Sequence, residues 1–177
     1  MDMISTSDFV GTAAFTVLFI LLACAVATDI SSRRIPNLLL VPALSIALIL
    51  HTMSNGVDGL MTAAAGLTLG LAMLSPLYAT GGMAAGDVKL LGVVGSFLGP
   101  WGAVVAGLAT MMAGGAFGLA VIVWQRLSPT PPLVNTDSIS HNDQVVYIPY
   151  APAIAVGTVA AFWYMGFSPD QIKGWTI

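Results

Sequence analysis

The sequence contains no glutamate and only one cysteine, Cys24, among 177 residues. A single thiol excludes an intramolecular disulfide framework and any metal site built from several cysteines. Charge of either sign is also scarce, because Lys, Arg and Asp together make up only 7% of the chain, whereas an ordinary soluble domain has roughly 25% charged residues. The five basic residues are too few to form a basic stripe for phosphates, so nucleic acid is not expected as a partner.

Apolar residues are abundant instead and make up 57% of the chain. They are gathered in runs too long for a soluble core, so the lipid bilayer is the expected surrounding of most of the chain. We therefore expect an all-α, polytopic membrane protein with one integral-membrane domain over residues 1–177. The six predicted membrane segments are residues 10–28, 36–53, 59–79, 88–98, 103–124 and 149–167. The one long polar stretch, about residues 125–147, is predicted to be an exposed loop.

Six crossings would place both termini on one side, and the positive-inside rule selects the outer side for them. In that orientation four of the five basic residues face the cytoplasm, namely Arg33, Arg34, Lys89 and Arg126. The polar loop would then be cytoplasmic as well. The same topology brings the segment ends that carry Asp29 and Asp87 to one face of the membrane.

Glycines recur four residues apart at three places, a spacing that lets membrane helices approach closely. These pairs are Gly66 with Gly70, Gly95 with Gly99, and Gly114 with Gly118. We expect all three to serve helix packing.

Three further side chains have chemical potential but an ordinary expected role. Cys24 lies in an apolar segment and is expected to be a small buried side chain. His51 and His141 are far apart in the chain and on opposite sides of the predicted topology, so we expect no metal site. No cofactor is expected either.

Asp29 and Asp87 are the two acidic residues best placed for chemistry. Asp29 ends the first apolar segment and should lie at the membrane surface. About a dozen residues, roughly 18 Å of helix, separate Asp87 from Gly99, which places Asp87 below the headgroups. An ionisable residue at that depth is costly and is a functional candidate by default. Each aspartate could instead cap a helix or form an ion pair, Asp87 with Lys89 or with an arginine of the first loop.

The two aspartates together suggest a catalytic arrangement. If one carboxyl is protonated and the other ionised, a water between them can be activated to attack a peptide carbonyl. The same two residues could instead bind a cation or relay protons in a transporter. The residues alone leave both alternatives open.

Three motifs, in this order along nearly the whole chain, resemble those of the type IV prepilin peptidases. They are Asp29 followed by Arg33-Arg34-Ile35-Pro36-Asn37-Leu38, then Gly86-Asp87-Val88-Lys89-Leu90-Leu91, then Ile148-Pro149-Tyr150-Ala151-Pro152-Ala153. Members of that family are polytopic aspartic proteases of bacterial inner membranes. They remove the short basic leader of pilin precursors at the cytoplasmic face.

The resemblance implies a catalytic pair, Asp29 and Asp87. It also implies a supporting set, which is Gly86, Lys89, Pro36 and Asn37. The expected partners are a prepilin substrate, the lipid bilayer and other proteins of pilus assembly.

Two departures from the family pattern refine these expectations. Only a short connection separates Asp29 from Asn37, so the methyltransferase insertion of larger members is not expected, and the chain resembles the short branch that serves Flp/Tad-type pili. The family pattern Gly-x-Gly-Asp has Ala84 at its first position here. If Ala84 disabled the site, the chain would be a non-catalytic subunit of a pilus machine.

Overall fold

The computed structural model describes residues 6–32, 35–127 and 150–165, and every regular element in this part of the chain is a helix. Helix α1 spans Thr6–Ser32, α2 spans Asn37–Ala79, α3 spans Ala85–Leu127 and α4 spans Ala151–Tyr164. Helices α1, α2 and α3 contain stretches long and apolar enough to cross a membrane, whereas α4 is apolar but shorter. The expected all-α class is confirmed for the described residues, and the length and composition of these helices are those of a membrane protein.

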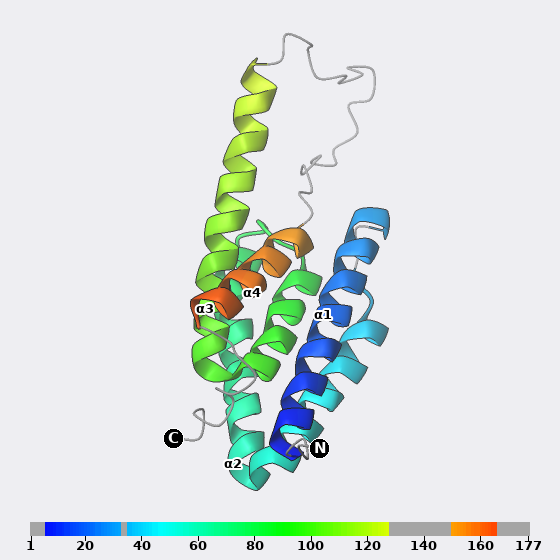
Figure 1. Ribbon diagram of the computed structural model, residues 1–177. Helices are drawn as coiled ribbons and strands as arrows, with labels where there is room; N and C mark the ends of the chain where they lie inside the picture. The colour runs from blue at the N-terminus through cyan, green and yellow to red at the C-terminus, as the bar shows by residue number, and fades with distance from the viewer. Residues whose placement is uncertain (1–5, 33–34, 128–149, 166–177) are drawn as a thin grey trace.

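The two long helices are each interrupted by a kink. In α2 the backbone leaves the helical conformation at Asn55 and Gly56, where Gly56 has φ 59°. In α3 it does so at Gly99, with φ 73°, directly before Pro100. Positive φ is readily available only to glycine, and proline lacks the N–H that would continue the helical hydrogen bonding. Figure 1 shows that α2 and α3 each reverse direction at the kink.

Contacts across the kinks confirm the reversals. Gly59 packs directly on the backbone carbonyl of His51, and a Cβ built on Gly95 would lie 3.0 Å from the Cβ of Ala103. Each long helix is therefore a helical hairpin, and the described residues form six helical segments close to the six predicted apolar segments. His51 also hydrogen-bonds through Nε2 to the carbonyl oxygen of Phe97 at 3.2 Å, close to the α3 kink.

Several predicted boundaries were wrong. Helix α3 begins at Ala85 rather than at residue 88, because the glycine-rich connection ends earlier than its composition indicates. It also continues to Leu127, three residues into the stretch predicted as a loop. Helix α4 has 14 residues, about 21 Å at 1.5 Å per residue, and is shorter than the predicted sixth segment. The rest of the predicted loop lies outside the described residues.

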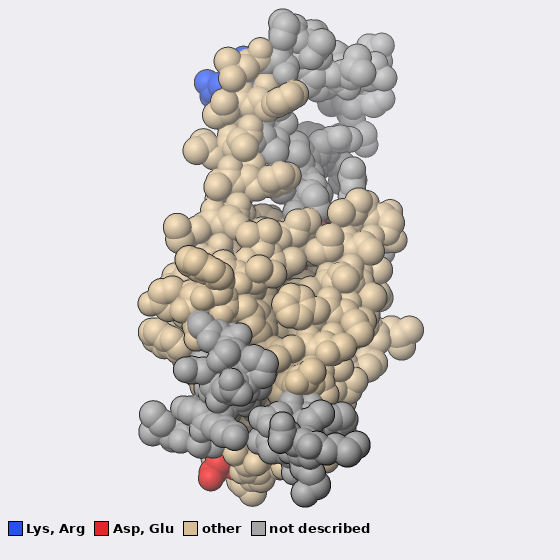
Figure 2. Space-filling view, in the orientation of Figure 1, with Lys and Arg blue, Asp and Glu red and all other residues tan. Residues whose placement is uncertain are grey.

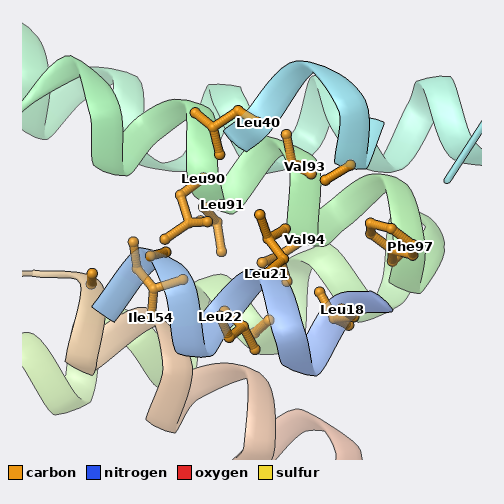
Figure 3. Close-up of a cluster of buried hydrophobic side chains, with 14 of the residues drawn as sticks. Leu18, Leu21, Leu22, Leu40, Leu90, Leu91, Val93, Val94, Phe97 and Ile154 are labelled. Carbon is orange, nitrogen blue, oxygen red and sulfur yellow. The ribbon is translucent and has the colours of Figure 1, made fainter. Parts of the chain in front are cut away.

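The first half of α3 is the centre of the molecule. Helix α3 contacts each of the other three helices, and residues 90–99 are all buried. Figure 3 shows Leu90, Leu91 and Val94 of α3 facing side chains of α1 and α4. A helix that is apolar on all sides is buried on all sides. The turn that precedes residues 90–99 is thereby surrounded by other helices, at the end of the bundle where α3 begins (Figure 1).

Glycines bring α2 and α3 into backbone contact, as the spacing predicts for two of the three pairs. Gly66 lies directly on the backbone of Gly95, and Gly70 lies on that of Leu91. The third pair behaves differently: Gly114 packs on the ring of Tyr150, and Gly118 has no neighbour on its open side.

The outer surface carries many large apolar side chains, among them Leu38, Trp124 and Trp163, each at least 75% exposed. Figure 2 shows the middle of one face almost without charged atoms, with basic atoms at the tip of α3 and acidic atoms at the opposite end. Such a surface is suited to lipid rather than to water. Cys24 belongs to it, because its side chain is exposed. The expectation of a buried Cys24 was wrong, since it lies on the outer side of α1.

Candidate active site

Asp29 lies in the last turn of α1 and is 6% exposed. Its Oδ2 accepts a hydrogen bond of 3.1 Å from the backbone N–H of Ala151, the first residue of α4. A buried carboxyl group without a partner is costly. The start of α4 therefore supplies the partner that Asp29 needs. Asp29 lies at the end of a helix and is therefore not an N-cap. The alternative of an ion pair with Arg33 or Arg34 concerns residues outside the described part of the chain.

Asp87 lies in the first turn of α3 and is 4% exposed. Its backbone N–H donates to the carbonyl oxygen of Ala84 at 3.1 Å, and its carboxyl group is hydrogen-bonded to the backbone N–H of Ala84. Ala84 directly precedes the helix, so Asp87 occupies the third helical position and supplies half of a capping box. The expectation that Asp87 itself precedes the helix, with Val88 as the first residue, was wrong by one turn.

The structure brings Asp29 and Asp87 together. They come from different helices, yet the charge of Asp29 acts on the carboxyl group of Asp87. Both are buried at the end of the bundle where α1 ends and α3 and α4 begin (Figure 1). The predicted convergence of the two aspartates is therefore found in the fold.

Lys89 has a different partner from the one considered for it. Its Nζ donates to Oδ1 of Asn37 at 3.1 Å, and both side chains are exposed. Asn37 is the first residue of α2, and Pro36 precedes it in an extended conformation with φ −70° and ψ 135°. Lys89 therefore links the start of α2 to the start of α3, beside the aspartate pair.

Gly86 allows the connection between α1 and α2 to lie against α3. A Cβ on Gly86 would stand 3.3 Å from the Cβ of Ile35 and 3.6 Å from its backbone nitrogen. These distances leave little room for any side chain. Gly86, Asn37 and Lys89 thus hold the start of α3 against the residues that lead into α2.

The described residues contain no group of three His, Cys, Asp or Glu that could hold a metal ion. His51 lies near the kinks and bonds to Phe97, and His141 is outside the described residues. The described site offers two carboxyl groups and the backbone amides that bond to them.

Comparison with known proteins identifies a family for the region of the chain that carries this site. Residues 16–119 match the type IV leader peptidase family, and this region includes both aspartates and more than half of the chain. The chain belongs to the type IV leader peptidase family. A relative from Bacillus subtilis (strain 168), a prepilin leader peptidase/N-methyltransferase, is 34% identical over 152 residues, which are 84% of this chain and 54% of the relative.

This member of the leader peptidase family thus spans about half the length of that relative. No solved structure matches the chain.

The amide of Ala151 is the site group that the sequence did not predict. Every residue except proline has a backbone N–H, so no residue type marks the one that reaches a carboxylate. The only signal was the third motif, Ile148 to Ala153, whose described residues begin at Tyr150. That motif predicted involvement of this segment but not its contact with Asp29.

Proposed function

We propose that this protein is a leader peptidase that hydrolyses a peptide bond with Asp29 and Asp87 as its catalytic pair. One observation supports this most strongly: two buried carboxyl groups from α1 and α3 lie close enough for one to act electrostatically on the other. Burying two acidic groups side by side opposes stability. Catalysis gives a reason to keep them together.

The proposed reaction uses one carboxyl as base and the other as acid. The ionised carboxyl accepts a proton from a water molecule, and the water oxygen bonds to the carbonyl carbon of the scissile peptide. The protonated carboxyl donates its proton to the carbonyl oxygen. When the tetrahedral species collapses and the C–N bond breaks, the carboxyl that took the water proton donates it to the leaving amine, and the other carboxylate takes a proton from a hydroxyl of the tetrahedral carbon. Each carboxyl alternates between the two protonation states, so no other group is needed to balance the protons.

The proposed substrate is a type IV prepilin of the Flp kind, cut between its basic leader and its hydrophobic helix. We further propose a multi-pass position in a bacterial inner membrane, with six crossings and the site at the cytoplasmic face. The described charges support this orientation. Lys89 is exposed in the second turn of α3, beside the aspartate pair. Arg126 is exposed in the last turn of α3, which lies on the same side because α3 reverses at Gly99 (Figure 1). Asp58 is exposed on the opposite side, next to the α2 kink.

Cleavage by the purified protein tests this function. The full chain in detergent is incubated with a Flp-type prepilin, and the products are identified by mass spectrometry. We expect one cut at the end of the basic leader. The control substrate has its leader residues next to the cut replaced, and it should stay intact. An intact natural prepilin, together with ion flux in proteoliposomes that requires Asp29 and Asp87, would instead favour a transporter.

A further inference from the structure

We propose that Tyr150 and Gly114 are positioning residues, which hold the start of α4 so that the Ala151 amide stays on Asp29. This inference depends on the proposed function, because it concerns the geometry of the proposed catalytic pair. It assigns a role in the reaction to the second half of α3, which carries no acidic residue.

The amide matters because of where Asp29 stands. Asp29 is in the last turn of α1, where unsatisfied carbonyl groups give the helix end a partial negative charge. That surrounding is unfavourable for a carboxylate. The N–H of Ala151, at the first position of α4, points the positive end of another helix at Asp29. Displacement of α4 would therefore change both the orientation and the electrostatic surroundings of Asp29.

The start of α4 is held by packing rather than by a side-chain cap. Tyr150 precedes the helix and makes no side-chain capping hydrogen bond. Its carbonyl oxygen accepts the N–H of Ile154 at 3.1 Å, which makes Tyr150 continuous with the helix. Its ring lies so close to Gly114 that even a Cβ at that position would overlap it. The position of the ring therefore depends on the absence of a side chain at residue 114.

A second contact between α3 and α4 lies one turn of α3 before Gly114 and involves the same face of α3. Gly157 of α4 packs directly on Thr110 of α3, whose hydroxyl donates to the carbonyl of Ala106 at 2.7 Å. Thr110 and Gly114 are four residues apart and so lie on one face of α3. This face determines where α4 lies, and α4 determines where the Ala151 amide lies.

The test compares adjacent glycines of α3. Gly114→Ala should displace Tyr150, whereas Gly115→Ala adds the same methyl group where nothing lies within 4 Å. We expect Gly114→Ala to lower kcat for prepilin cleavage by about 10-fold or more with KM unchanged, because misplacement of a catalytic group by about 1 Å can cost roughly 100-fold. Gly115→Ala should keep both constants. Equal losses in the two variants would overturn the proposal.

Substitution of Tyr150 provides an independent arm. Tyr150→Phe keeps the ring and should retain kcat, whereas Tyr150→Ala should lower it. In the Tyr150→Ala background, Gly114→Ala should cause no further loss, because its clash partner is gone. A parental kcat in Tyr150→Ala, or a change confined to KM, would overturn the inference. If the parent itself does not cleave prepilin, the proposed function fails instead, so the two failures are distinguishable.

Discussion

At the scale of single residues, backbone amides are the described hydrogen-bond partners of both aspartates. Asp29 accepts the N–H of Ala151, and Asp87 is bonded to the N–H of Ala84. Each donor lies where a helix begins, so its N–H has no partner within its own helix. Lys89, two residues after Asp87, is bonded to Asn37 instead. We therefore expect Lys89 to act on the site indirectly, by holding the start of α2 against the start of α3.

Lys89→Ala should therefore slow prepilin cleavage without abolishing it. The hydrogen bond to Asn37 is exposed, and an exposed polar interaction contributes roughly 1 kcal/mol or less, which corresponds to a loss of about five-fold at most. Asn37→Ala should have the same effect, and the double variant should be no slower than either single variant. Cleavage rates of the four proteins measure this. A far greater loss in Lys89→Ala than in Asn37→Ala would show that Lys89 acts on the reaction directly.

Ala84→Gly should leave cleavage within a few-fold of the parent. Ala84 precedes α3 and lies outside the helix, where glycine is preferred over alanine, and its contribution to Asp87 comes from a backbone N–H that glycine also has. The melting temperature should not fall. Cleavage rate and thermal unfolding in detergent measure both expectations. A large gain in rate would instead show that Ala84 limits the natural enzyme.

At the scale of the helices, the kinks determine the architecture. Gly99 has φ 73° and ψ −179°, a conformation essentially restricted to glycine. At this turn α3 reverses, so its second half runs back toward the aspartate end and packs against α4. His51 of α2 bonds to Phe97 at this turn, so the α2 and α3 hairpins are joined at their closed ends.

Gly99→Ala should destabilise the protein. An L-residue forced into this conformation costs about 1–3 kcal/mol, and the strain would fall on the turn that orients half of α3. The melting temperature in detergent, compared with that of Gly115→Ala, separates backbone strain from the general effect of an added methyl group. An unchanged melting temperature in Gly99→Ala would mean that the α3 kink does not depend on glycine.

Apolar runs predicted where the helical segments lie, because a long apolar run has few alternatives to a helix in lipid. Consecutive crossings also predicted a reversal between residues 53 and 59 and another between residues 98 and 103. The apolar runs did not predict how short these two connections are, because that depends on the backbone angles of Gly56 and Gly99. Depth and motifs singled out Asp29 and Asp87 as site candidates, and the structure places the two near one another. The Ala151 amide was not found, since contacts between distant segments leave no local signal.

At the scale of the whole molecule, the two ends differ in chemistry. One end holds the buried aspartates and the exposed Lys89, whereas the α2 kink at the other end exposes Asp58. The exposed apolar surface lies between them (Figure 2). From the positive-inside rule we expect the aspartate end to face the cytoplasm.

Thiol labelling measures this orientation. Ser32 and Ser54 lie at opposite ends and are both exposed, and Cys24 is replaced by alanine first because it is itself exposed. In intact cells, a membrane-impermeant reagent should label Ser54→Cys and leave Ser32→Cys unlabelled. Both should react after the cells are opened. Labelling of Ser32→Cys alone in intact cells would show that the aspartate end faces the outside, and the proposed cytoplasmic position of the site would then be wrong.

The most direct test of the central claim is prepilin cleavage by Asp29→Asn, Asp87→Asn and the double variant. Asparagine keeps the size of the side chain and removes the ionisable proton, and members of a catalytic unit are strongly non-additive. We predict that each single variant, present in the membrane at the parental level, loses cleavage by a factor of at least about 10³. The double variant should be no worse than either. Removal of the leader at a comparable rate by either single variant would contradict the account.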